Sequence, residues 1–482
     1  MKKKILSGVL AVFISLVTIT GVNAQSYNWN QFRANGNVIQ ATTPTTSTTT
    51  KLAWLQNFVD QSLYVIYSNP VIDGGYIYIA VDGELIKLDT SGNIIQKANL
   101  NANISYNAYI ASGDGKIFVA LGNGTIQAFD QDSLSSLWIS QSQNGQLCSP
   151  LTYYNGYLYT GTTLYDDSYN VADGTYFALD TSDDDPNSSL EVKYNSWEYS
   201  NQAGGYYWSL ATIVNDQYLF FVSSGGTVVS KNLTNEQTTA MNLSGENISI
   251  RSGIAYGDGK LYVCSQNGHL YVLSFNDGSF NLEQERLLLD GNAQITGTPT
   301  YVDGTLYFGG RNGSSWESPG FIAKLDVATN QITTVETAGY VQASLLVTTG
   351  YDDAIYGYYT CNCEPGSLYV FKDTGDSLTT EELYQPESDY QNYNMSSAIS
   401  DGNKLYFTND SGTLFALETG ETQITVPDNQ EDTTSTIDTA NNITEDQKVA
   451  SVKTGDDKIT GVLLSLIISG GACLYLKKEM FD

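Results

Sequence analysis

The feature that most constrains the fold is a pattern that the sequence repeats eight times. Each copy has a turn of the type Asp/Asn-Gly or Asp/Asn-Asp, and an aliphatic-aromatic pair begins three or four residues after the first turn residue. The aromatic members of these pairs are Tyr78, Phe118, Tyr159, Phe220, Tyr262, Tyr307, Tyr356 and Tyr406. They are 40 to 50 residues apart, except for one gap of 61 residues. Repeats of this length with alternating strands are typical of the blades of a β-propeller.

Within a copy, the pattern predicts three strands joined by tight turns. In the fifth copy a second strand follows the Asp258-Gly259 turn, and a third begins at His269, directly after Gly268. Gly and Asp/Asn favour such turns because they tolerate positive φ. The fourth, outer strand is poorly patterned, but residues 51–54 look like one that stands before the first copy. We therefore predict an all-β, eight-bladed propeller of four-stranded antiparallel blades, closed by pairing of the N- and C-terminal segments.

Two segments resemble a known family. Residues 128–138, Ala-Phe-Asp-Gln-Asp-Ser-Leu-Ser-Ser-Leu-Trp, resemble the quinoprotein-type (PQQ-like) repeat, commonly Ala-Leu-Asp-Ala-x-Thr-Gly-x-x-x-Trp. Residues 29–35, Trp-Asn-Gln-Phe-Arg-Ala-Asn, are similar to the Trp-x-x-Phe-Arg-Gly-Asn segment that often precedes such propellers. The resemblance spans residues 28–424 and implies a PQQ-like β-propeller domain, which we place at residues 25–425.

Residues 1–24 have the composition of a secretory signal peptide. Lys2, Lys3 and Lys4 precede a short apolar run, and small residues at Val22 and Ala24 suit cleavage after Ala24. We therefore expect the mature chain to be exported and to begin at residue 25.

The C-terminal region predicts a surface anchor. Residues 426–450 are acidic and rich in Thr and Asn, with too few apolar residues to offset ordering entropy, so we expect a stalk. Residues 451–482 combine a short motif, an apolar run with the length of a membrane span, and a basic tail. This order resembles a Gram-positive sortase signal: Lys453, Thr454 and Gly455 match the end of Leu-Pro-x-Thr-Gly, whereas Ser451 and Val452 replace its Leu-Pro. The resemblance implies linkage to peptidoglycan through Thr454; without cleavage, the apolar run stays in the membrane. Either outcome leaves the propeller outside the cell, on its surface.

The net charge argues against one class of partner, and the single His leaves little scope for several kinds of catalytic site. The chain has 22 Lys+Arg against 52 Asp+Glu, a formal net charge of -30, which becomes -32 without the signal and the residues after Gly455. Binding to a phosphate backbone depends on Lys and Arg, so we expect no nucleic-acid partner. A single His leaves little scope for His-based metal sites or Ser-His-Asp triads.

The family resemblance raises the question of a quinone cofactor. Quinoprotein dehydrogenases of this type carry an adjacent Cys-Cys pair and an acidic/amide cluster that holds Ca²⁺. This chain has no adjacent cysteines; the nearest approach is Cys361 with Cys363, either as two thiols or as a strained disulfide. We therefore expect no cofactor and do not expect PQQ. The candidate metal is Ca²⁺ at Asp183, Asp184 and Asp185, which offer oxygen ligands; a solvated acidic loop is the alternative.

The ligand-binding candidates are residues that precede inner strands. In this family such residues approach one mouth of the central channel, so the resemblance brings together Tyr67, Tyr106, Tyr207, Trp208, Arg251 and Gln342. Aromatic faces with amide donors suit a sugar ring or a partner surface. For the aromatic residues of the long gap, the alternative to ligand binding is packing between blades. We expect a binding module for a glycan or a surface protein. The competing class is an extracellular enzyme, either a quinone-dependent dehydrogenase or a carboxylate-driven polysaccharide-cleaving enzyme.

Overall fold

The computed structural model describes residues 27–34, 38–39, 44–58, 67–105, 108–166, 171–188, 191–200, 204–243, 248–315, 318–350 and 352–420. These ranges form 37 strands and two short 3-10 helices, η1 (Leu289–Gly291) and η2 (Ser388–Tyr390). None of the helices in these ranges has the length and hydrophobicity needed to cross a bilayer. The predicted signal peptide, stalk, sorting motif and membrane span lie outside the described residues.

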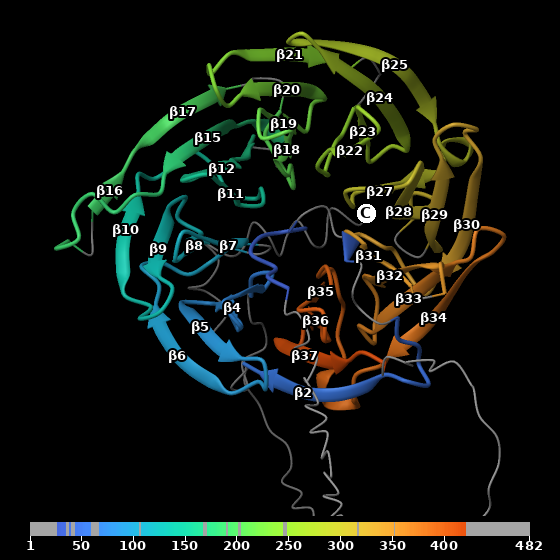
Figure 1. The fold of residues 1–482 in the computed structure, drawn as a ribbon, viewed down its shortest axis with the longest axis horizontal. Coiled ribbons are helices and arrows are strands. Elements are labelled where there is room, and N and C mark those ends of the chain that lie inside the picture. The colour runs from blue at the N-terminus through green and yellow to red at the C-terminus, as the bar shows by residue number, and fades with distance from the viewer. Residues whose placement is uncertain are drawn as a thin grey trace, which may run out of the picture.

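Eight small sheets stand in a ring around a central axis, so the predicted eight-bladed propeller is confirmed (Figure 1). From the innermost strand outwards, blades 1 to 4 are β3 (Val71–Asp73), β4 (Tyr76–Val81), β5 (Glu84–Asp89), β6 (Ile94–Asn99); β7 (Ile110–Gly113), β8 (Lys116–Ala120), β9 (Ile126–Asp130), β10 (Ser136–Ser140); β11 (Thr152–Tyr154), β12 (Tyr157–Gly161), β15 (Thr175–Asp180), β17 (Asn195–Ser200); and β18 (Thr212–Val214), β19 (Tyr218–Val222), β20 (Thr227–Asn232), β21 (Thr238–Asn242).

Blades 5 to 8 continue the ring in the same order. They are β22 (Ala255–Gly257), β23 (Lys260–Cys264), β24 (His269–Asn276), β25 (Ser279–Leu287); β27 (Thr300–Val302), β28 (Thr305–Asn312), β29 (Gly320–Asp326), β30 (Ile332–Thr337); β31 (Leu346–Thr349), β32 (Ile355–Thr360), β33 (Leu368–Asp373), β34 (Leu378–Tyr384); and β35 (Ile399–Ser400), β36 (Lys404–Asn409), β37 (Thr413–Glu418), β2 (Lys51–Asn57). Three short strands extend blades: β16 (Glu191–Lys193) on blade 2, β26 (Ala293–Gln294) on blade 6 and β1 (Val38–Ile39) on blade 7.

The predicted turns form the innermost hairpin of the blades. In blade 2 both turn residues have positive φ, 53° at Asp114 and 69° at Gly115. These angles match the twist of the flanking antiparallel strands, which explains why Asp/Asn and Gly recur there. In blade 1 the turn lies one residue later than predicted, at Gly74 and Gly75, because Asp73 still pairs with Tyr76 as the end of β3.

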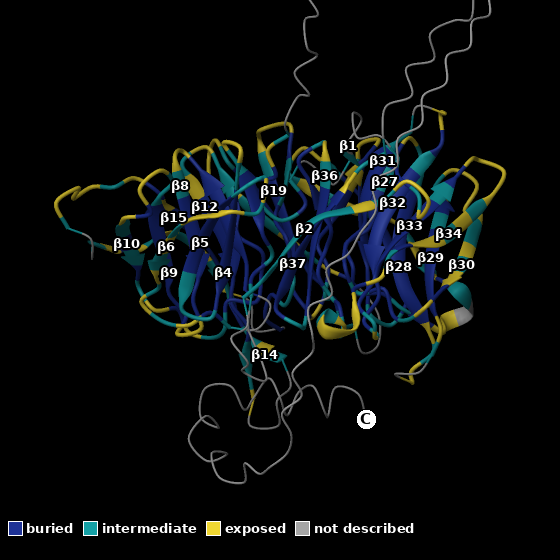
Figure 2. Cartoon of the chain, turned by 90° about the horizontal axis from the view of Figure 1, so that it is seen from below, coloured by how far each residue is buried: buried dark blue, intermediate teal, exposed yellow. Residues whose placement is uncertain are grey.

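The long gap between Tyr159 and Phe220 contains two additions to blade 3 and its neighbour. The hairpin β13 (Leu164–Tyr165) and β14 (Val171–Asp173) projects from one face of the disc (Figure 2), and β16 adds a parallel strand to the outer edge of blade 2. The rings of Trp197 and Tyr199 pack edge-on against Phe221, and Tyr206 is fully buried. For these aromatic residues, packing between blades is the observed role.

The ring is closed by β2, whose pairing with the last strand confirms the predicted closure. β2 runs antiparallel to β37, from Lys51 opposite Glu418 to Asn57 opposite Thr413. The side chain of Trp54 links this blade to blade 1, because its Nε1 donates to the carbonyl of Thr90 at 3.0 Å. The same indole lies over the turn at Gly92, where an added Cβ would come within 2.6 Å of the ring. Closure therefore joins blade 8 both within its sheet and across to blade 1.

Replacing Trp54 with Ala tests this junction. We expect the free energy of unfolding to fall by about 3 kcal/mol, because the variant loses a large packed ring and the bond to Thr90. Denaturant unfolding would measure the change. Tyr194→Ala is the control, since Tyr194 is 69% exposed and its loss should be nearly neutral. Equal midpoints for the two variants would contradict a role of Trp54 in closure.

The chain contains 35 tyrosines, and burial gives many of them a common response to pH. Burial raises the pKa of Tyr78 to about 12, and it also raises the pKa values of Tyr109, Tyr176 and Tyr206 above the usual 10. A raised folded-state pKa contributes stability that is complete below pH 10 and is lost as pH rises through the folded-state value. The buried Arg33, whose pKa burial lowers to about 9, acts in the opposite direction but is a single group.

We therefore expect stability to fall steeply from pH 10 upwards. Circular dichroism followed against pH should show loss of the fold in the same step in which tyrosinate absorbance rises, because the buried phenols ionise only on unfolding. Tyr194→Phe, which removes an exposed phenol, should leave the midpoint unchanged. Smooth ionisation of the tyrosines with the fold intact would contradict this account.

Candidate functional site

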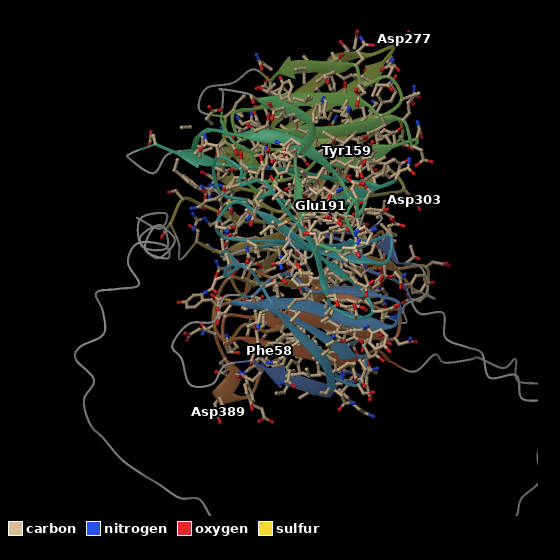
Figure 3. The ribbon with its side chains drawn as sticks, turned by 90° about the vertical axis from the view of Figure 1, so that its left-hand side faces the viewer. Phe58, Tyr159, Glu191, Asp277, Asp303 and Asp389 are labelled. Carbon is tan, nitrogen blue, oxygen red and sulfur yellow. The ribbon has the colours of Figure 1, made fainter. Side chains whose placement is uncertain are left out.

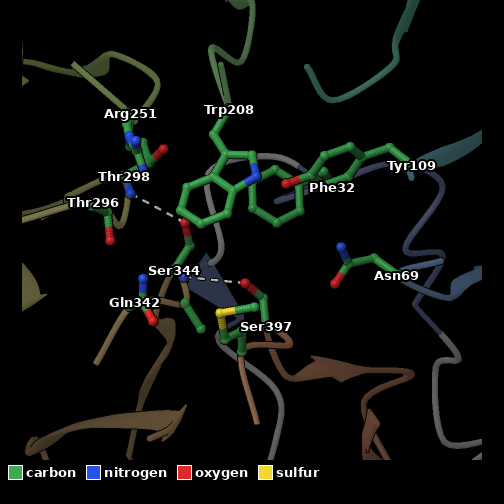
Figure 4. A pocket seen from close by; sticks show the side chains of 12 residues that line it. Phe32, Asn69, Tyr109, Trp208, Arg251, Thr296, Thr298, Gln342, Ser344 and Ser397 are labelled. Carbon is green, nitrogen blue, oxygen red and sulfur yellow. Dashed lines mark hydrogen bonds between the residues drawn. The ribbon is translucent and has the colours of Figure 1, made fainter. Parts of the chain in front are cut away.

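A pocket lies at one mouth of the central channel, where the segments that precede the inner strands converge. The space between its lining residues, counted together with the open solvent that adjoins it, is about 400 Å³. Residues from different blades face it, among them Asn69, Tyr109, Trp208, Arg251, Gln342 and Ser397 (Figure 4). Because most of the blades contribute residues that precede their first strand, the pocket exists only in the closed ring.

The inner wall of the pocket is formed by the N-terminal segment, which crosses the channel. Trp29 bridges to Ile72 of blade 1, and the carbonyl of Asn30 accepts from the backbone N–H of Ser112 in blade 2 at 2.7 Å. Further along, β1 pairs in parallel with β31 of blade 7. Phe32 lines the pocket and packs edge-on against Tyr109, with ring centroids 5.2 Å apart. The segment therefore ties opposite blades together and presents an aromatic ring to the pocket.

Trp208 is held in an unusual backbone conformation. Its φ is 57°, in the left-handed region that bulky residues rarely adopt, and its N–H donates to the carbonyl of Cys148 at 3.1 Å. Its half-buried indole faces the pocket, and its ring centroid lies 4.9 Å from that of Tyr207. Backbone strain of this kind persists only where the surrounding structure holds it, and it concentrates at functional sites.

Arg251 is the charged side chain on the pocket wall. Its guanidinium carbon lies 4.9 Å from the centroid of the Tyr207 ring, in cation–π contact. A second arginine, Arg311, makes the same contact with Tyr340 at 4.8 Å, and its Nε donates to Gln294 at 2.9 Å. Burial raises the pKa of Tyr340, against the opposing effect of both guanidiniums. Both guanidiniums are therefore close enough to Tyr340 to act on its hydroxyl group.

Hydroxyl side chains link successive blades around the pocket. The N–H of Gly253 donates to Thr298 Oγ1 at 2.7 Å, that of Thr298 to Ser344 Oγ at 3.2 Å, and that of Ser344 to Ser397 Oγ at 3.1 Å (Figure 4). These bonds satisfy backbone donors that no strand neighbour reaches. Gln342 is positioned in turn by Asn362, whose Nδ2 donates to its Oε1 at 2.5 Å. The wall is therefore polar but internally bonded.

The structure brings some of the predicted ligand-binding residues together. Trp208, Arg251 and Gln342 line the pocket, and Tyr207 packs against two of them. Tyr67 lies elsewhere, because its hydroxyl donates to Asp410 at 3.0 Å and its backbone bridges to Val81. Tyr106 lies outside the described residues.

Phe32 and Tyr109 line the pocket but were not among the predicted residues. Tyr109 stands immediately before β7, whereas the predicted residue, Tyr106, stands three residues earlier. Phe32 belongs to the Trp-x-x-Phe-Arg segment, on which part of the family resemblance rests. That segment held the only sequence signal that could have pointed to Phe32.

The acidic triplet predicted as a Ca²⁺ site lies beside β16, away from the pocket. Lys193 bonds both Asp184 and Glu191, and the backbone N–H groups of Asp184 and Asp185 donate to Glu191 Oε2 at 3.0 and 2.9 Å. Lys193 lowers the pKa of Asp184, whereas burial, together with Glu191, raises that of Asp183. Across the ranges that the structure describes, no three Cys, His, Asp or Glu side chains are grouped as metal ligands. Ca²⁺ binding at Asp183–Asp185 stays a prediction.

Cys361 and Cys363 are free thiols in this structure and lie against each other beside Gly339. Burial raises the pKa of Cys361, and the bond from Cys361 lowers that of Cys363. The residue between them is Asn362, which holds Gln342 of the pocket. The thiols themselves are not part of the pocket wall.

The residues present do not fit a Ca²⁺-bound quinone. Such a group needs carboxylate and amide oxygens for the metal ion in addition to cations for its own carboxylates. The described residues that line the pocket include one cation, Arg251, but no Asp, Glu or Cys. We therefore assign no reaction step to that cofactor.

Comparison with known proteins agrees with the fold. The family model described as outer membrane protein assembly factor BamB matches residues 35–239. No sequence among the curated proteins matches the chain.

The similar solved structures are propellers with very different sequences. Quinohemoprotein alcohol dehydrogenase from Comamonas testosteroni has a TM-score of 0.61 at 12% identity, over 85% of this chain and 83% of that one. A second quinohemoprotein alcohol dehydrogenase, from Pseudomonas putida HK5, has a TM-score of 0.58 at 12% identity, over 84% and 82%. BamB from Moraxella catarrhalis has a TM-score of 0.52 at 12% identity, over 77% and 97%. At such identities the likeness concerns the fold alone: the chain is an eight-bladed β-propeller, and its residues 35–239 match the BamB family model.

Proposed function

We propose that this protein is a non-catalytic binding module whose channel-mouth pocket takes a terminal sugar unit of a glycan. The observation that carries the proposal is Trp208, which is held at a φ of 57° with its indole facing the pocket. A pocket that combines a flat apolar face with amide groups, here those of Gln342 and Asn69, suits the apolar face and the hydroxyl groups of a sugar ring.

The residue types on the pocket wall favour binding over catalysis. Cleavage of a polysaccharide by carboxylates needs two such groups across the scissile bond. The described lining residues include no carboxylate at all, so they offer no such pair. The dehydrogenase activity in the names of two similar structures is therefore not transferred to this chain.

The predicted targeting segments place this module at the cell surface. A signal peptide at residues 1–24 and an anchor at residues 451–482 would display the propeller outside the cell on an acidic stalk. The hairpin β13–β14 lies beside the entrances of the inner strands, because it joins β12 to β15 at the end of the blade where the pocket opens. That face is the one we expect a surface glycan to meet.

A partner protein is a second candidate, favoured by a different feature. Val192 and Tyr194, at the outer rim of blade 2, are 45% and 69% exposed. Exposed apolar groups on an edge strand are typical of protein contacts. The acidic residues are spread over the surface; in Figure 3, Asp303 and Asp389 lie at opposite faces of the disc. A protein partner would therefore meet a negatively charged surface.

Substitution of Trp208 by Gly tests the glycan proposal. We expect affinity for the oligosaccharides that bind the unaltered protein on a glycan array to fall about tenfold or more. Glycine adopts positive φ without steric cost, so the relief of strain should offset part of the lost packing and the melting temperature should change little. Tyr194→Ala is the control and should keep full binding.

The opposite pattern would count against the proposal. If Trp208→Gly binds every oligosaccharide as before while its melting temperature falls, the ring is a packing group only. A rise in the melting temperature of the unaltered protein with PQQ and Ca²⁺, but with no oligosaccharide, would instead favour the dehydrogenase alternative.

A further inference from the structure

Arginine is scarce in this chain and unevenly placed. The sequence contains four arginines, Arg33, Arg251, Arg286 and Arg311, beside 18 lysines. Arg286, on β25, donates to the carbonyl of Asn330 at the outside of the ring. The other three come from distant parts of the sequence and meet at the channel mouth. None of the described residues that line the pocket is a lysine.

Contacts to one short segment, residues 296–299, connect the parts of the chain that carry the three arginines. Arg33, which is 5% exposed, donates to the carbonyl of Thr298 at 2.5 Å and to that of Pro299 at 2.9 Å. Arg251 begins the loop whose Gly253 donates to Thr298 Oγ1. Arg311 stacks on Tyr340, whose hydroxyl bonds Thr296 at 3.3 Å. Three positive charges thus surround the pocket wall of blade 6.

This local charge is opposite in sign to that of the molecule. The chain carries a formal net charge of -30, yet the described lining residues contain one arginine and no carboxylate. In a partly enclosed pocket, such charges act through a lower effective dielectric constant than at the open surface. The mouth of the channel is therefore a place where an anionic group can be held against the overall repulsion.

We infer that the pocket is built for an acidic sugar, with the sugar carboxylate on Arg251 and the sugar ring against Trp208. This inference rests on the proposed glycan function and specifies its ligand class. A planar guanidinium matches a carboxylate with two parallel hydrogen bonds. Arg251 is among the described residues that line the pocket, whereas Arg33 and Arg311 are not, so these two strengthen the positive field rather than contact the ligand. One guanidinium facing the pocket suits the single charge of a uronate.

The test compares two oligosaccharides that differ in one group. Galacturonate-terminated and galactose-terminated trisaccharides would be titrated by calorimetry into the full-length protein and its variants. We expect the acidic form to bind about tenfold more tightly, with an advantage that shrinks as salt is added. Arg251→Gln should abolish the advantage, so that the acidic and the neutral forms bind with similar affinity, and Arg251→Lys should restore part of it.

Arg286→Gln is the matched control, because it removes one positive charge outside the pocket and should leave both affinities unchanged. Melting curves confirm that each variant is folded. Equal binding of the two trisaccharides by the unaltered protein would overturn the inference and leave the glycan function standing. Binding of neither would count against both. An acidic preference that survives in Arg251→Gln, or displacement by inorganic phosphate but not by free galacturonate, would also overturn it.

Discussion

The whole structure depends on the antiparallel ladder between β2 and β37. A β-propeller has no separate core: each blade buries its faces against two neighbours, and its outermost strand is otherwise an open edge. Blade 8 obtains its fourth strand from residues Lys51–Asn57, more than three hundred residues away from the strand that they pair with. Without this pairing blade 1 would lose a neighbour, the channel would open, and the residues that form the pocket would no longer face one another.

The channel-mouth pocket follows from the closed ring together with the segment that crosses it. The segments that lead into the inner strands lie next to the central axis, so their side chains can meet even when they are far apart in the sequence. The crossing segment blocks the channel with Phe32 and Arg33, and turns a pore into a pocket with an inner wall. The strain at Trp208 is then tolerated because packing on Tyr207 and the bond to Cys148 hold the residue from two sides.

The fold could be predicted from the sequence, because the turns and strands of each blade recur in the sequence at regular intervals. The turn at Asp114 and Gly115 and the detached strand around Trp54 are readable from a single copy, since local backbone preferences dictate them. The pocket could be predicted only in part. The segments that lead into the inner strands are irregular, so no repeat spacing predicts which residue faces the pocket, and Tyr109 was missed although it lines the wall.

Other contacts had no local signal at all. The bond from Arg33 to Thr298 spans 265 residues, and its existence depends on the crossing segment as a whole. Likewise, the acidic residues 183–185 gave no indication that Lys193 would form an ion pair with one of them. That contact requires β16 to join the edge of another blade. Charge balance of this kind is a property of the assembled ring.

The position of β37 has a mechanical consequence. This strand lies between β2 and β36, with Glu418 opposite Lys51 on one side and Lys404 on the other. Its hydrogen bonds to both neighbours run across the strand direction. A force that pulls the chain along the strand beyond Glu418 would therefore load both ladders in shear, with many bonds sharing the force at once rather than breaking one after another. The strand with which β2 pairs to close the ring is thus also well placed to bear tension.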